Sequence, residues 1–205
     1  MIADSPEPVA GLPARPLVLA STSRYRRELL SRLGLPFTAV APAADETPLP
    51  GEAPAATALR LAAAKARSIA AGWPQALIVG SDQVADADGV AVGKPGTAAA
   101  ARAQLARLSG RTVVFHTGVA LLDAATGACQ TALVDVRSRF RTLSAATIDA
   151  YLTREQPYDC AGSVKSEGLG IALFEAIESD DPTALIGLPL ISVVRMLGAA
   201  GVAVP

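Results

Sequence analysis

The chain has 205 residues, 51% of them hydrophobic, and a formal net charge of −1. This length suffices for one hydrophobic core, or for two small lobes that share a cleft. The balanced charge disfavours a general nucleic-acid-binding protein, which normally carries a basic excess. No stretch of the sequence approaches the ~20 consecutive apolar residues of a transmembrane helix. We therefore expect neither nucleic acid nor a membrane as a partner.

Composition also limits the catalytic chemistry. Cys129 and Cys160 fit neither a zinc-binding spacing nor a disulfide framework, and two unpaired thiols suit the reducing cytoplasm. The single histidine, His116, lies in a β-like run and is predicted to be a strand residue rather than a catalyst. Ser-His-Asp and Cys-His mechanisms are therefore hard to assemble. Carboxylates, lysines and a metal ion remain as the catalytic groups.

The order of predicted elements indicates an α/β fold. Residues 1–16 are rich in proline and lack the apolar segment of a secretion signal, so we predict a flexible tail there and one domain over 17–205. An apolar run at 17–19 predicts a strand that leads into a helix at 25–33, which Gly34 ends. Further helices are predicted at 55–71, 97–108, from 144 and at 189–199, and further strands at 76–79, 90–92, 111–122, 129–141 and 169–176.

Hydroxyl and arginine side chains gather where the first strand leads into the first helix, with Ser21 and Arg26 among them. A helix start offers unpaired backbone N–H groups and the positive end of the helix dipole. Hydroxyls and guanidinium groups added there make a receptor for phosphate. The alternative is a surface helix whose arginines are only solvated.

Two acidic residues stand out as candidates for catalysis or metal binding. Asp82 follows the buried strand 76–79, and open α/β sheets place their ligand sites at strand ends. An ionised carboxylate there needs a partner, so Asp82 is either functional or a structural hydrogen-bonded residue. Glu46 lies in a loop bounded by prolines and is also compatible with ordinary solvation.

The candidate lysines are Lys94, which is held between a glycine and a proline, and Lys65, which lies midway along an alanine-rich helix. Lys165 and Glu167 lie in a glycine-flanked loop. Solvent-facing side chains are the alternative for Lys65 and for this loop. Taken together, the candidates supply cations for phosphates, carboxylates for Mg²⁺ and one carboxylate to activate water.

Seven motifs follow one another with compatible spacing over about 17–200. They are 19–30 (LASTSRYRRELL), 45–47 (DET), 61–66 (LAAAKA), 80–84 (GSDQV), 93–95 (GKP), 160–168 (CAGSVKSEG) and 187–190 (GLPL). Together they resemble the Maf-like nucleotide pyrophosphatases. The resemblance implies an α/β fold of the Maf and ITPase type, with an elongated mixed β-sheet flanked by helices and two lobes around a central cleft.

The resemblance also implies an activity and a set of site residues. The expected reaction is hydrolysis of a nucleoside triphosphate between its α and β phosphates with a divalent cation such as Mg²⁺, Mn²⁺ or Co²⁺. By position, Asp82 resembles the family's proton acceptor, and it is predicted to share the metal with Glu46. The positions predicted to bind substrate phosphates or the rest of the nucleotide include Ser21, Arg26, Lys65, Lys94 and Lys165. A homodimer is compatible with the resemblance.

Three variable positions point to one branch of this family. Tyr25, Gln83 and Glu167 differ from the residues usual in branches that cleave dTTP and UTP, and are similar to the branch that acts on 7-methyl-GTP. Methylation at N7 makes guanine cationic, which an aromatic face and a carboxylate can both recognise. Gln83 can hydrogen-bond the base or sugar. Arg24 stands where the family usually has proline.

Two alternatives stay open at this point. One is a pyrophosphatase for UTP, dTTP or other modified nucleotides. The other is a nucleotide-binding regulator of cell division with little catalysis. A protein that only binds nucleotides would not need a carboxylate such as Asp82 to activate water. No Gly-x-x-x-x-Gly-Lys-Ser/Thr motif occurs, so a P-loop NTPase is disfavoured.

Overall fold

The computed structural model describes residues 15–204, and within them seven strands form one mixed β-sheet in the order β2-β1-β3-β5-β6-β7, with β4 paired to β3. The strands are β1 (Leu17–Ala20), β2 (Thr38–Val40), β3 (Leu77–Ala87), β4 (Val90–Val92), β5 (Thr112–Asp123), β6 (Cys129–Phe140) and β7 (Phe174–Glu178). The α-helices are α1 (Arg24–Ser31), α2 (Pro54–Ser68), α3 (Ala98–Leu108), α4 (Ala145–Glu155) and α5 (Leu190–Ala199). The α/β prediction and the flanked mixed sheet are confirmed.

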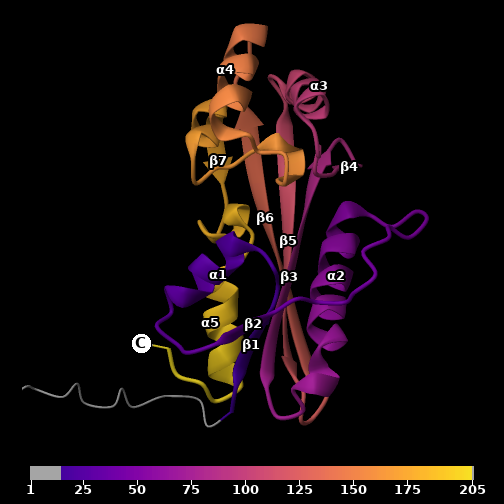
Figure 1. The fold of residues 1–205 in the computed structure, drawn as a ribbon, viewed down its shortest axis with the longest axis vertical. Helices are drawn as coiled ribbons and strands as arrows, with labels where there is room; N and C mark the ends of the chain where they lie inside the picture. The colour runs from indigo at the N-terminus through magenta and orange to yellow at the C-terminus, as the bar shows by residue number, and fades with distance from the viewer. Residues whose placement is uncertain (1–14, 205) are drawn as a thin grey trace, which may run out of the picture.

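Three long antiparallel strands, β3, β5 and β6, run along most of the molecule (Figure 1). On one side, β1 pairs in parallel with the first half of β3 and ends opposite Gly80. Strand β3 continues past this point, paired with β5 as far as Asp86. The second half of β3 therefore loses its β1 neighbour where the chain turns into α1, and this step in the sheet opens space for a site.

Separate hydrophobic clusters support the two ends of the sheet. At one end, α3 and α4 pack over β5 and β6, with Leu105, Phe115 and Phe140 in the core. At the other end, α1 and α5 cover one face of the sheet while α2 covers the opposite face (Figure 1). These clusters form the two lobes that the family resemblance implies.

Two glycines allow α2 to lie directly on the sheet. A Cβ atom at Gly80 would meet the backbone oxygen of Ala62, and one at Gly118 would meet the backbone oxygen of Ala58. Because neither strand carries a side chain at these points, the helix backbone approaches the strands closely. This approach brings Lys65, on the next turn of α2, down onto β3.

The structure differs from the sequence prediction in three elements. Strand β3 does not end at 79 but continues through Ala87, since β5 pairs with it from Leu77 to Asp86 and β4 pairs with its last residues. The predicted strand at 169–176 is instead a 3₁₀ turn, Leu169–Leu173, followed by β7. Strand β2 was not predicted, because its three residues carry no clear alternation.

Other predictions concern single residues and the N-terminus. His116 is a strand residue on β5, as predicted, and its ring nitrogens lie 2.7 Å from Asp135 Oδ1 and 3.3 Å from Asp86 Oδ2. Most of the predicted tail, 1–14, lies outside the described residues, while Arg15 at its end donates to Asp123. In the part that the structure describes, no helix is long and apolar enough to span a membrane.

Candidate active site

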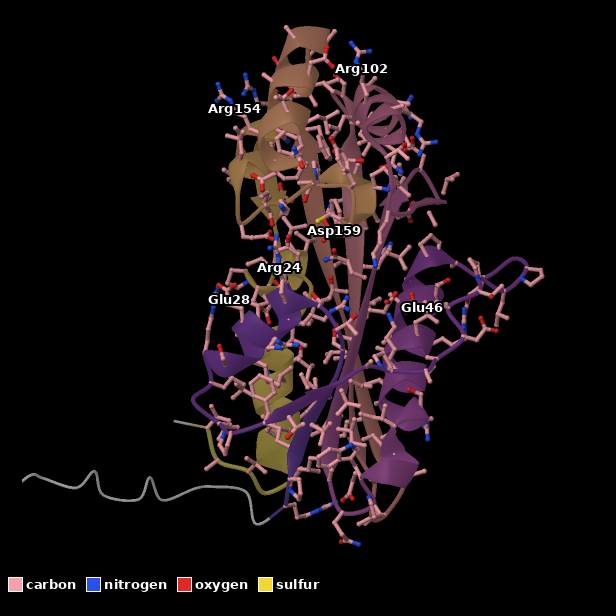
Figure 2. The ribbon with its side chains drawn as sticks, in the orientation of Figure 1. Arg24, Glu28, Glu46, Arg102, Arg154 and Asp159 are labelled. Atoms are coloured by element: carbon pink, nitrogen blue, oxygen red, sulfur yellow. The ribbon has the colours of Figure 1, made fainter. Side chains whose placement is uncertain are left out.

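A cleft with a cavity volume of about 470 Å³ lies where β1 ends, between the two lobes. Its walls come from the 21–26 segment, the loop before α2, strand β3, the segment after β4 and the 159–167 and 186–187 segments. Figure 2 shows Glu46 on one side of this middle region, with Arg24 and Asp159 on the other. The predicted residues that line the cleft are Ser21, Tyr25, Arg26, Glu46, Lys65, Gln83, Lys94 and Glu167.

The ammonium of Lys65 joins both predicted carboxylates. Its Nζ atom lies 2.5 Å from Asp82 Oδ1 and 2.9 Å from Glu46 Oε1. Lys65 and Asp82 are only 5% and 8% exposed, so the solvent-facing alternative for Lys65 is wrong. Asp82 sits within β3 rather than at its end, at the first positions that β1 leaves uncovered. A buried ion pair of this kind is costly to break, because either partner alone would be an uncompensated charge.

Glu46 reaches this pair from the loop between β2 and α2, and its side chain stays half-exposed. Partial burial raises the pKa of its carboxyl, but the hydrogen bond and charge of Lys65 outweigh this effect. The more distant charges of Lys94 and Arg26 act in the same direction and leave the pKa below its ordinary value. Glu46 is therefore held as a carboxylate that faces a cluster of cations.

Arg26 enters the site from the first turn of α1. The helix begins after Ser23, whose hydroxyl accepts from the Arg26 backbone N–H at 3.3 Å, and the Ser21 hydroxyl accepts from Ser23 N at 3.1 Å. The Arg26 Nε–H donates to the Gly187 carbonyl at 2.8 Å. Desolvation lowers the pKa of Arg26, while Asp82 and Glu46 oppose this shift. Its guanidinium is thus a fixed, partly desolvated cation, a strong phosphate ligand.

The predicted base-recognition residues lie in the same cleft. The Gln83 amide nitrogen donates to Thr117 Oγ1 at 2.9 Å and to the carbonyls of Ala184 and Leu185 at 3.0 Å. Its amide oxygen is consequently the atom left to accept from a ligand. The Arg24 guanidinium carbon lies 4.7 Å from the Tyr25 ring centre, and Nη2 donates to the Tyr25 hydroxyl at 2.6 Å.

Lys165 is placed differently from the other predicted residues. Its Nζ atom donates to the backbone and side-chain oxygens of Glu155, at 3.2 and 3.0 Å. The Glu155 carboxylate also accepts from Leu169 N at 2.7 Å. Lys165 therefore links the loop that carries Glu167 to the end of α4. Its contact with substrate stays a prediction.

Sequence reasoning missed two groups at the cleft. Asp159 and the Gly187 carbonyl both line it. Asp159 gave no signal because it lies in a predicted loop without a motif of its own. A backbone carbonyl cannot be read from residue type, although Gly187 belongs to one of the family motifs.

The model of the Maf-like protein family matches residues 16–200, which covers nearly the whole chain and every residue of the cleft. The chain belongs to the Maf-like family. Membership agrees with the order and spacing of the seven motifs and with the two-lobed sheet.

Individual relatives of this Maf-like chain extend over most of its length. A 7-methyl-GTP pyrophosphatase of Burkholderia pseudomallei (strain 1710b) is 63% identical over 188 residues, which are 90% of this chain and 87% of the relative. Proteins with the same name from Polaromonas sp. and Bordetella pertussis are each 60% identical over 93% of this chain, and over 87% and 96% of their own lengths. The similarity is therefore not confined to one motif.

The predicted donor set for a divalent cation in this Maf-like chain consists of Glu46 and Asp82. Among residues 15–204, no group of three or more His, Cys, Asp or Glu side chains is arranged to hold a metal ion. Mg²⁺ in nucleotide enzymes is often bound by one or two carboxylates together with substrate phosphates. Two carboxylates beside phosphate-binding cations fit a cation that arrives with the nucleotide, and this assignment stays a prediction.

Proposed function

We propose that the chain hydrolyses 7-methyl-GTP between its α and β phosphates, giving 7-methyl-GMP and diphosphate. The observation that carries this proposal is that Glu46, Lys65 and Arg26 line one cleft, while Asp82 is paired with the same Lys65 ammonium. High identity to proteins named 7-methyl-GTP pyrophosphatase supports the choice of nucleotide.

The phosphate chain is assigned to the cationic part of the cleft. Arg26 offers a guanidinium whose direction is fixed by its hydrogen bond to the Gly187 carbonyl. Lys94 adds a second positive charge from the segment after β4. Residues 23–26 at the start of α1 also line this cleft, and a helix start contributes the positive end of its dipole. These fixed charges stabilise the negative charge that develops on the leaving diphosphate.

Asp82 is assigned the role of accepting a proton from the attacking water. Lys65 donates to its Oδ1 atom, and among the described residues no side chain donates to Oδ2. Lys65 thereby fixes the direction of the carboxylate and leaves one oxygen for water. A bound Mg²⁺, Mn²⁺ or Co²⁺ held by Glu46 and Asp82 would supply charge neutralisation at the phosphates.

The base is assigned to Tyr25, Gln83 and Glu167. The aromatic ring and the carboxylate both favour a cationic base, and the Gln83 oxygen accepts from an N–H group. Arg24 already lies over the Tyr25 ring, so a base that stacks on this face must displace it or use the opposite face. A cytoplasmic location and a homodimer stay predictions of the family resemblance.

A nucleotide panel tests the reaction and the base together. Diphosphate release is measured from 7-methyl-GTP, GTP, UTP and dTTP with Mg²⁺, Mn²⁺ and Co²⁺. We expect 7-methyl-GTP to give the highest kcat/KM. A rate no higher than that for GTP or UTP would overturn the choice of base. Tight nucleotide binding without turnover would favour the regulator of cell division.

Substitution of the proposed proton acceptor tests the mechanism. In Asp82→Asn we expect kcat to fall about 10²–10⁴-fold, as for loss of a general base. Circular dichroism checks that the variant is folded. Asp149→Asn, which alters an exposed pair with Arg102 in the other lobe, serves as the control and should keep its activity. A folded Asp82→Asn variant with normal turnover would contradict the assigned role.

A further inference from the structure

The turn at 183–188 holds side chains of the active site through its backbone carbonyls. The Gly187 oxygen accepts from Arg26 Nε at 2.8 Å and from Ser81 Oγ at 2.9 Å. Two further carbonyls of the turn accept from the Gln83 amide. The conformation of this turn therefore sets the direction of a phosphate-binding cation and of a base-binding amide.

A buried carboxylate holds the start of this turn through hydrogen bonds. Asp181 is 1% exposed, and its Oδ1 atom accepts from the Thr183 backbone N–H at 2.9 Å and from the Thr183 hydroxyl at 2.6 Å. Its Oδ2 atom accepts from Ile191 N at 2.8 Å, in the first turn of α5. Within residues 15–204 it has no ion-pair partner, so hydrogen bonds and the start of α5 stabilise its charge.

Thr183 brings the two ends of the turn together. Its hydroxyl accepts from Leu190 N at 2.9 Å and lies 2.9 Å from the Leu188 carbonyl oxygen. Between these anchors, Gly187 adopts a φ of +119°, a conformation that a residue with a side chain rarely takes. The carbonyl of Gly187 points at Arg26 because both ends of this short segment are fixed.

We propose that Asp181 and Thr183 are positioning residues of the active site, which act on substrate through the Gly187 carbonyl and Arg26. The inference rests on the proposed function, in which Arg26 binds phosphate. Loss of either anchor lets the turn relax and leaves the guanidinium without its fixed acceptor. A misplacement of about 1 Å in an active site can cost about 100-fold in rate.

Substitutions at Thr183 separate its hydroxyl from its shape. Thr183→Val removes the hydroxyl and keeps the branched outline, whereas Thr183→Ser keeps the hydroxyl. We expect kcat/KM for 7-methyl-GTP to fall about tenfold to a hundredfold in Thr183→Val and in Asp181→Asn. Thr183→Ser should stay near the wild-type value. Equal activity of Thr183→Val and the wild type would overturn the proposal.

A matched core variant excludes a general effect of lost stability. Leu122 is buried in a hydrophobic cluster that contains no residue of this turn, so Leu122→Ala creates a cavity outside the core that contacts the turn and lowers the unfolding temperature. Its kcat/KM should match the wild type at temperatures well below unfolding. If Thr183→Val behaves in the same way, Thr183 is only a structural residue and the proposal is wrong.

A double-mutant cycle tests whether the effect passes through Arg26. Arg26→Lys keeps the positive charge but removes the Nε–H that Gly187 accepts. In this background we expect Thr183→Val to cause little further loss, because residues that act as one unit are not additive. Losses that simply multiply would show that Thr183 does not act through Arg26.

Binding of inorganic pyrophosphate distinguishes this proposal from the proposed function. If the wild type hydrolyses no nucleotide, the proposed function has failed, and calorimetric titration with pyrophosphate still tests the positioning. Thr183→Val should then weaken pyrophosphate binding, and should do so only while Arg26 is present. A wild-type protein that neither hydrolyses nucleotides nor binds pyrophosphate would overturn both.

Discussion

Lys65 is the residue on which the two carboxylates of the cleft converge. It reaches Asp82 and Glu46 from a helix that the glycines of β3 and β5 allow to lie close to the sheet. A lysine with two carboxylates leaves the cluster with an excess of negative charge. This charge suits the cluster to a divalent cation, while Arg26 and Lys94 in the same cleft suit the neighbouring space to phosphate.

At the same scale, Glu167 tests the choice of base. Glu167→Gln removes the negative charge that favours a cationic base and keeps nearly the same shape. We expect the ratio of kcat/KM for 7-methyl-GTP to that for GTP to fall about tenfold, the size expected for one hydrogen bond to a charged group. GTP hydrolysis serves as the internal control. An unchanged ratio would remove Glu167 from base recognition.

Among the elements, the close packing of α2 on the sheet depends on the absence of side chains at Gly80 and Gly118. Gly80→Ala would push a methyl group into the backbone of α2, so we expect a loss of about 1–3 kcal/mol in the free energy of unfolding and a lower kcat, because Lys65 moves with the helix. Denaturant unfolding and turnover measure the two effects.

A glycine without close neighbours provides the control for this substitution. Gly198 lies in α5, and a Cβ atom added there would have no neighbouring atom within 4 Å, so Gly198→Ala should stabilise the protein by about 0.5–1 kcal/mol. If Gly80→Ala also leaves the free energy of unfolding and the turnover undiminished, α2 does not approach β3 as closely as described.

The loop that carries Glu46 gives a pH prediction. Arg60 holds the pKa of Glu52 well below its ordinary value of 4.5, at about 2, with burial opposing and Thr57 assisting. Arg60 also donates to the Thr47 carbonyl, next to Glu46. Because the folded-state pKa is lowered, the stabilisation is present above pH 4.5 and is lost as the pH falls toward about 2.

Thermal unfolding measured over this acidic range tests the assignment. The unfolding temperature of Glu52→Gln should fall less steeply with pH than that of the wild type, since the variant has no carboxylate to protonate there. Curves that stay parallel down to about pH 3 would show that Glu52 contributes nothing to the acid sensitivity.

Comparison of the elements with the sequence shows which features could be predicted and which could not. Asp82 stood out in the sequence because a carboxylate that follows a buried strand requires a partner, whereas Lys65 was predicted as a site residue from the resemblance to the Maf-like family. The length of β3 was not predicted, since Ser81, Asp82 and Gln83 look like a strand end until β5 is known to pair with them. The Arg26 contact with Gly187 spans 161 residues and uses a backbone oxygen, which no residue pattern reveals.

On the scale of the whole molecule, the cleft lies where separately packed lobes share one sheet. The long strands β3, β5 and β6 continue from one lobe into the other, so the ladder of backbone hydrogen bonds fixes the lobes to each other (Figure 1). We therefore expect a cleft that is largely preformed, with the loops at 41–53 and 159–167 as the parts that adjust to the nucleotide.

The position of water attack tests the central claim most directly. Hydrolysis of 7-methyl-GTP in oxygen-18-labelled water, with the products identified by mass spectrometry, shows which phosphorus is attacked. Attack at the α-phosphorus, directed by Asp82 in this cleft, predicts label in 7-methyl-GMP and unlabelled diphosphate. Label in released diphosphate or phosphate, or no hydrolysis at all, would contradict the account.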